Sequence, residues 1–136
     1  LATRGVLKQA DSTGSKAIEN IQQLITLQTI LVKSKPDSLA DKLWLARMKE
    51  SLAMAFLNAD DKAAAKETLL DSISISKQLL DNPELSHGAI RILISQHRNL
   101  AKICHATGNE ESEKQAQQQA AEYAKLLPSR GRQNRR

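Results

Sequence analysis

The stretch NADDKAAAKETLL, residues 58–70, decides the fold, because a similar stretch, ATGNEESEKQAQQ, follows 48 positions later at residues 106–118. Each stretch joins a short polar break to a run rich in Ala, Glu or Gln, and Lys, residues that lose little side-chain freedom in a helix. Each break also supplies a helix-capping side chain, Asp60 or Asp61 in the first and Asn109 in the second. The two stretches therefore predict two helical hairpins of one design.

Apolar residues recur at helical spacing on both sides of these breaks. Gly108 favours a left-handed helix end, and Pro36 and Pro83 stop the helices that precede them. Ser15 and Ser38 are predicted to cap two further helices. The pattern predicts helices over residues of about 2–12, 15–35, 38–58, 61–81, 86–107 and 109–127, the first of them weakened by Gly5.

The composition agrees with a helical fold. A chain of 136 residues is one domain that is large enough to bury a core without a metal or a disulfide. Trp44, Phe56 and Tyr123 are its only aromatic residues, so the core must consist mainly of Leu, Ile and Ala. Five Gly and three Pro are too few for the turns of an all-β protein. We therefore predict an all-α fold.

Shifting the chain by the same interval superposes more than the two breaks. The positions that coincide are Gly5, Ala53 and Ala101; Ile21 and Leu69; Ile25, Ile73 and Ala121; and Leu31, Leu79 and Leu127. Chance agreement between amphipathic helices is the alternative explanation. We predict a stack of about two and a half hairpins, in repeats of about 1–35, 36–82 and 83–128, followed by a disordered tail over 129–136.

The second copy resembles a tetratricopeptide repeat. The residues that carry the resemblance are Leu52, Ala53 and Phe56 in its first helix and Ala65, Leu69 and Ser72 in its second. The 48-residue period is longer than the family's usual 34 and is similar to arrays found beside bacterial signalling domains, particularly serine/threonine kinases. The resemblance implies a right-handed superhelix that binds proteins, with a catalytic domain such as a kinase upstream in the full-length protein. HEAT-like repeats are the structural alternative.

The net charge of +5 is concentrated at the end of the chain. Four of the positive charges belong to Arg130, Arg132, Arg135 and Arg136. A small nucleic-acid-associated protein that uses this tail is our alternative function, since such cations neutralise phosphates. The nearly neutral body has no aromatic platform on which bases could stack, which disfavours nucleic acid as the partner.

No catalytic or metal-binding arrangement is evident in the sequence. The histidines are His87, His97 and His105, and His97 and His105 lie eight residues apart on one predicted helix, not at the i,i+3 or i,i+4 spacing of helical metal ligands. Cys104 and His105 are adjacent on one helix and point about 100° apart, so they cannot form a nucleophile–base pair. We expect no enzyme activity, no cofactor and no metal in this module. We interpret Cys104 as a small core residue and His97 as a partly buried residue of the repeat.

One polar constellation suggests a binding surface. Residues spaced by four, three, four and three follow one face of a helix, and they are Arg91, Ser95, Arg98, Lys102 and His105. The tetratricopeptide resemblance implies a concave groove lined by Arg47, Glu50, Met54, Leu57 and Asn58 in one copy and by Ser95, Arg98, Lys102, His105 and Ala106 in the next. A basic wall beside an apolar patch at Met54 and Leu57 suits a peptide or protein with acidic groups. The alternative is an ordinary solvated helix face.

The first copy is incomplete, because its first helix is degenerate. Ile18, Ile21 and Leu24 are therefore expected to be exposed unless an upstream domain or a second subunit covers them. The most apolar run, residues 24–32, is too short and too interrupted to cross a membrane. A lone cysteine is compatible with a reducing compartment, and we predict a cytoplasmic location without a membrane partner.

Overall fold

The computed structural model of the chain describes the backbone of residues 2–128 and the side chains of residues 14–128. These residues form the helices α1 (Ala2–Ser34), α2 (Leu39–Asn58), α3 (Lys62–Leu79), α4 (Ser86–Ala106) and α5 (Glu110–Lys125). The described part of the chain contains no strand, so the all-α prediction is confirmed there. The predicted basic tail, residues 129–136, lies outside the described residues.

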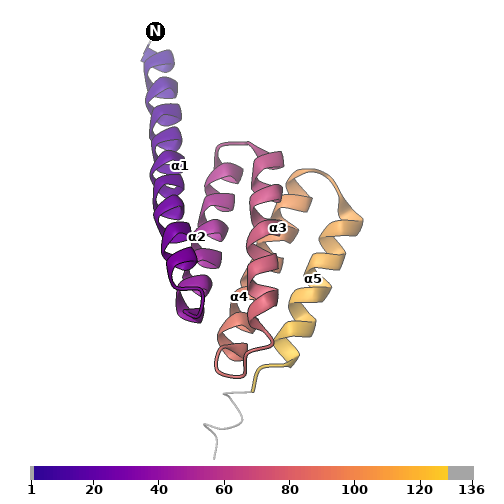
Figure 1. Cartoon of the computed structure of the whole chain (residues 1–136). Helices are drawn as coiled ribbons and strands as arrows, with labels where there is room; N and C mark the ends of the chain where they lie inside the picture. Colours follow the sequence, from indigo (N-terminus) through magenta and orange to yellow (C-terminus); the bar gives the residue numbers. More distant parts are fainter. Residues whose placement is uncertain (1, 129–136) are drawn as a thin grey trace, which may run out of the picture.

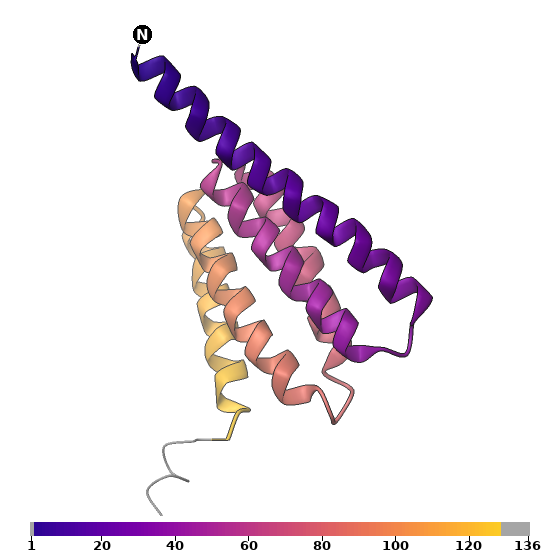
Figure 2. The ribbon, with the colours of Figure 1, turned by 90° about the vertical axis from the view of Figure 1, so that its left-hand side faces the viewer.

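The helices form a row with α1 at one end and α5 at the other, and α4 lies partly behind α3 in this view (Figure 1). The most extensive contacts are those of α2 with α3 and of α4 with α5, while α1 packs on α2 and α3 packs on α4. Helix α2 also touches α4 directly. The first part of α1 extends beyond the other helices (Figure 2). Within the described residues, no helix has both the length and the apolar character needed to cross a membrane.

The turn between α2 and α3 has the same geometry as the turn between α4 and α5. Asp61 accepts a hydrogen bond from the N–H of Ala64, and Asn109 accepts one from the N–H of Ser112, both at 3.2 Å. The residue before each cap has a positive φ, 63° at Asp60 and 76° at Gly108. Both cap N–H groups also donate to a carbonyl five residues earlier, at 2.9 Å. These hydrogen bonds make two Schellman-type helix ends, 48 residues apart in the sequence.

The cap predicted at Asp60 or Asp61 is therefore Asp61, and Asp60 takes the left-handed position that Gly108 occupies in the other turn. Asp tolerates this conformation better than most side chains do. Ser38 begins α2 as predicted, but its hydroxyl makes no capping hydrogen bond, so that part of the prediction is wrong.

The N-terminal region also differs from its prediction. A cap at Ser15 predicts separate helices over 2–12 and 15–35, but α1 is one helix of 33 residues that continues through Gly14 and Ser15. A glycine inside a helix costs about 1 kcal/mol relative to alanine. A break would leave several backbone N–H and C=O groups without helical partners. With no proline in this segment to force the break, the continuous helix is the more stable arrangement.

The core lies where α2, α3 and α4 meet. Its members are Ala53, Ala65, Leu69, Ile73, Leu93 and Ile103, all buried. Ala53 and Ala65 are completely buried, which allows the backbones of α2 and α3 to approach closely. Half-buried apolar side chains, including those of Phe56 and Tyr123, pack around this cluster.

A buried polar chain joins the same helices. The Ser72 hydroxyl on α3 donates to the carbonyl oxygen of Ala46 on α2, and the Gln96 amide nitrogen on α4 donates to the Ser72 oxygen at 2.7 Å. Because a buried polar group without a partner is costly, these hydrogen bonds favour one register among the helices. The Gln96 carbonyl oxygen has no protein partner among the described residues. The hydrogen bonds thus fix how α2 and α4 sit on α3, and that arrangement positions the surface described below.

Candidate functional site

The predicted polar stripe is present on α4. Its five members are exposed, and they are Arg91, Ser95, Arg98, Lys102 and His105. The opposite face of α4 carries Ile92, Leu93 and Ile103, which are buried. The spacing of the polar residues along the sequence was therefore sufficient to identify the exposed face of this helix.

A hollow between α2 and α4 brings together part of the predicted groove. It is lined by Arg47, Glu50, Ser51, Met54, Ala55, Asn58, Ser95 and Asn99. The Glu50 carboxylate accepts hydrogen bonds from the Ser95 hydroxyl at 2.6 Å and from the Asn99 amide at 2.7 Å. Glu50, predicted to contact a partner, is thus already held by neutral donors across the two helices. We call this site the α2–α4 hollow.

A second hollow, the α4–α5 hollow, contains three further residues of the stripe. Its lining is Arg98, Ala101, Lys102, His105, Glu113 and Gln117. Nδ1 of His105 lies 3.1 Å from Oε1 of Glu113, on the facing helix. The predicted groove is therefore two adjacent hollows that share α4 as their common wall.

Three predicted groove residues line neither hollow. Leu57 is half-buried and packs against the core cluster, so it does not form an apolar binding patch with Met54. Arg91 and Ala106 are exposed on α4, outside both linings. Whether Leu57 is buried depends on the rotation of α2 about its own axis relative to α3. The apolar character of Leu57 does not by itself determine that rotation.

The charges on this surface are mixed. Among the described residues, Arg47, Arg98 and Lys102 make no ion pair. Two carboxylates interrupt them, Glu50 in one hollow and Glu113 in the other. The surface therefore presents separate cationic points rather than the continuous basic wall that the sequence suggested.

His97 is buried on the other side of α4, in a third hollow shared with α3 and α5. Its ring stacks on Tyr123, with 5.5 Å between the ring centroids. Neither ring nitrogen has a hydrogen-bond partner among the described residues. Burial, and to a smaller extent the charge of Lys77, lowers the pKa of His97 below its ordinary value of 6.5.

The lowered pKa of His97 predicts a pH dependence of stability. As pH falls below about 6.5, the unfolded chain binds a proton at this histidine before the folded chain does, so the free energy of unfolding decreases. His97→Phe keeps an aromatic ring beside Tyr123 and removes this titration, so its loss of stability between about pH 7 and pH 5 should be smaller. Urea unfolding across this pH range measures the difference. His87→Phe, at an exposed position, is the control, and equal pH profiles for wild type and His97→Phe would contradict the assignment.

The described residues contain no group of three His, Cys, Asp or Glu side chains that is arranged to hold a metal ion. The Cys104 thiol is buried in the α4 packing, in agreement with its interpretation as a core residue. The two hollows beside α4 are lined mainly by charged, amide, hydroxyl and thioether side chains.

Comparison of the chain with protein-family models, with curated proteins and with solved structures finds no match in any of the three.

Proposed function

We propose that this chain is a non-catalytic interaction module that binds an acidic protein or peptide segment across the two hollows of α2, α4 and α5. The observation that carries the proposal is the exposure of Arg47, Arg98 and Lys102 around these hollows with no ion-pair partner among the described residues. Surface cations without internal partners are available to the carboxylates of another molecule.

The architecture supports a tetratricopeptide-like array as the framework of this module. The α2–α3 and α4–α5 hairpins have equivalent turns, and α2 contacts α4 as the first helices of stacked hairpins do. A single hairpin cannot bury its apolar face, so stacking leaves an extended surface on one side. The resemblance adds a setting, a cytoplasmic bacterial signalling protein with its catalytic domain elsewhere in the chain.

The geometry suggests the pattern of charge in the partner. Glu50 lies in the α2–α4 hollow together with Arg47, and Ser95 and Asn99 hold its carboxylate in place. A continuous acidic run would meet this carboxylate and be repelled. Acidic groups separated by apolar residues would reach the cations and place an apolar side chain near Met54, which lines the α2–α4 hollow.

A suitable probe is a fluorescein-labelled peptide in which each Glu is followed by one Leu and one Ala. Its binding is measured by fluorescence anisotropy at about 50 mM salt, where surface charges are weakly screened. Arg98→Glu with Lys102→Glu should weaken binding at least about tenfold, since the acidic groups of the peptide would then meet repulsion. Both side chains are exposed, so the helical circular dichroism should not change.

Lys114→Glu with Lys125→Glu is the matched control. It changes the net charge by the same amount at exposed positions of α5 outside both hollows. This variant should bind the peptide almost as the wild type does, and a Lys-for-Glu version of the peptide should not bind. The proposal fails if the wild type does not bind the acidic peptide, or if the two double variants lose affinity equally.

A further inference from the structure

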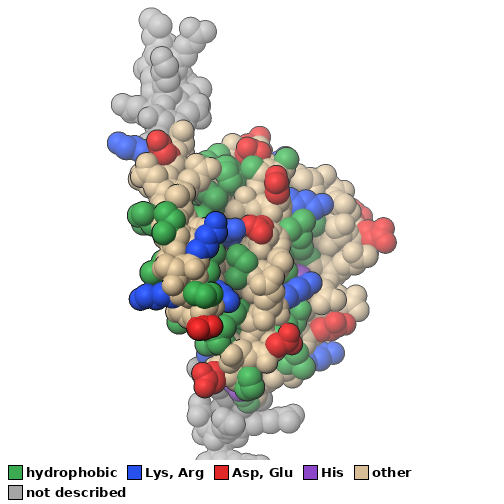
Figure 3. Space-filling model, viewed as in Figure 1, with side chains coloured by type: hydrophobic (Ala, Val, Ile, Leu, Met, Phe, Trp, Pro, Cys, Tyr) green, Lys and Arg blue, Asp and Glu red, His purple; other side chains and the backbone are tan. Residues whose placement is uncertain are grey.

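The end of the row formed by α1 carries an exposed apolar surface that the proposed binding site does not use. Leu24, Leu27 and Ile30 on α1 are 53%, 64% and 60% exposed, and Trp44 on α2 is 56% exposed. No charged residue occurs in the sequence from 20 to 32. Hydrophobic side chains are visible along α1 at the edge of the molecule, with basic side chains beside them (Figure 3). Contiguous exposed apolar surface of this kind is typical of an interface.

The same surface is hollowed between the two helices. This α1–α2 hollow has a volume of about 590 Å³ and is lined by Ile21, Leu24, Trp44, Arg47, Met48 and Ser51. Ile21 and Met48 are only half-buried there, and Arg47 borders both this hollow and the α2–α4 hollow. The hollow thus leaves apolar side chains of α1 and α2 without a packing partner among the described residues.

The correspondence between consecutive repeats identifies the kind of element that fits this hollow. The positions equivalent to its lining are Leu69, Ser72, Ile92, Ser95, Gln96 and Asn99, on α3 and α4. Helix α2 binds this equivalent surface, since Ala46 accepts a hydrogen bond from Ser72 and Glu50 accepts hydrogen bonds from Ser95 and Asn99. Leu69, Ile92 and Gln96 are buried, whereas Ile21, Trp44 and Met48 at the matching positions are not. The α1–α2 hollow therefore has the form of a site for a helix that runs antiparallel to α1.

We propose that α1 of a second copy of this chain supplies that helix, in a two-fold symmetric dimer. A two-fold axis perpendicular to α1 pairs the helix with itself in the antiparallel direction that the hollow requires. With Leu27 beside the axis, Leu24 of each copy faces Ile30 of the other. Leu24, which lines the hollow, then lies within the interface in both copies.

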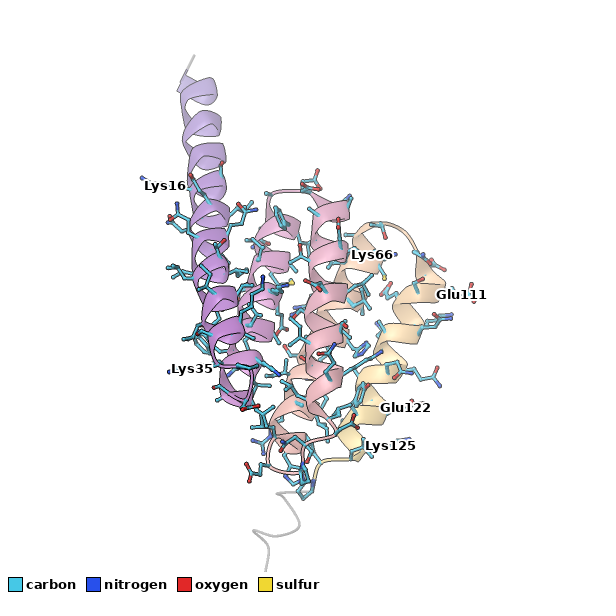
Figure 4. The ribbon with its side chains drawn as sticks, in the orientation of Figure 1. Lys16, Lys35, Lys66, Glu111, Glu122 and Lys125 are labelled. Atoms are coloured by element: carbon cyan, nitrogen blue, oxygen red, sulfur yellow. The ribbon has the colours of Figure 1, made fainter. Side chains whose placement is uncertain are left out.

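The charges at the two ends of the apolar strip are complementary in this pairing. In the register that places Leu27 on the axis, Glu19 of one copy is at the level of Lys35 of the other along the paired helices, and Lys16 is near the level of Asp37. All four side chains are exposed. Lys16 and Lys35 point away from the neighbouring helices, near the two ends of the strip (Figure 4). Opposite charges therefore lie at similar levels at both ends, and the centre contains no charge that would repel a second copy.

The oligomeric state in solution tests the proposal. Sedimentation equilibrium at micromolar concentrations should give a dimer for the wild type. Leu27→Glu would place two carboxylates at the centre of the interface and should weaken dimerisation at least about tenfold. Leu126→Glu is the control, because Leu126 is 62% exposed at the end of α5 and away from this surface. A monomeric wild type, or equal effects of the two variants, would overturn the proposal.

The pairing register has its own test. Glu19→Lys and Lys35→Glu should each weaken the dimer, and the double variant should recover it, because the two charges then face each other with their signs exchanged. A Leu27→Cys chain should cross-link to itself with a short thiol–thiol reagent, whereas an Asn20→Cys chain should cross-link to a Ser34→Cys chain instead. Cys104 is buried and contributes little background. A double charge variant weaker than either single variant, or efficient self-cross-linking of Asn20→Cys, would exclude this register.

Discussion

Leu69→Ala is expected to lower the free energy of unfolding by about 2–5 kcal/mol. Leu69 is completely buried in the core cluster, beside Ala53 of α2 and Leu93 of α4. Truncation removes its apolar contacts and leaves a cavity between three helices that pack on one another and cannot easily collapse. Urea unfolding of the variant, followed by circular dichroism at fixed pH, measures the loss.

Ile21→Ala is the matched comparison. Ile21 occupies the position of α1 that Leu69 occupies in α3, but it is half-buried at the edge of the α1–α2 hollow. Its truncation should cost about 1 kcal/mol in the monomer, since less apolar surface returns to water. In the proposed dimer the cost should increase with protein concentration, because association stabilises the folded state. Equal losses of stability for Leu69→Ala and Ile21→Ala at low protein concentration would contradict the difference in burial between these two positions.

Most of the fold could be predicted from the sequence because its signals are local. The bounds of α3, α4 and α5 follow from capping side chains, a glycine and a proline that act on their own backbone. Asp61, Gly108 and Asn109 have the roles that their residue types predict. Where local signals are weak, prediction failed. Ser15 is a good cap in isolation, but it lies within a helix because continuing the backbone hydrogen bonds is more favourable than starting again.

The candidate site was predictable only in part, for a different reason. The exposure of Arg98 and Lys102 follows from the period of one helix and was confirmed. The hydrogen bonds of Glu50 to Ser95 and Asn99 depend on how far α4 slides along α2. No single helix contains that information, because the buried contacts of both helices with α3 determine it. The 48-residue correspondence in the sequence was the available signal, because it pairs position 47 with 95 and position 51 with 99.

Ala53→Leu should destabilise the fold by about 1–3 kcal/mol, for the opposite reason to Leu69→Ala. Ala53 is completely buried in the same cluster as Ala65, between α2 and α3. A larger side chain has no space there, so it must adopt an unfavourable rotamer or push the helices apart. Leucine is a good helix former, so the loss would reflect packing and not helix propensity. Thermal or urea unfolding measures the cost.

Ala59→Leu separates this packing effect from the general effect of a larger side chain. Ala59 is exposed at the end of α2, where its backbone is close to helical and its side chain contacts solvent. The substitution should change the free energy of unfolding by no more than about 0.5 kcal/mol.

Ala101→Leu extends the comparison, because Ala101 is the buried residue of α4 that corresponds to Ala53. If the α4–α5 hairpin is built as the α2–α3 hairpin is, Ala101→Leu should resemble Ala53→Leu. A response at Ala101 like that at Ala59 would mean that the two hairpins share their turns but not their close helix contact.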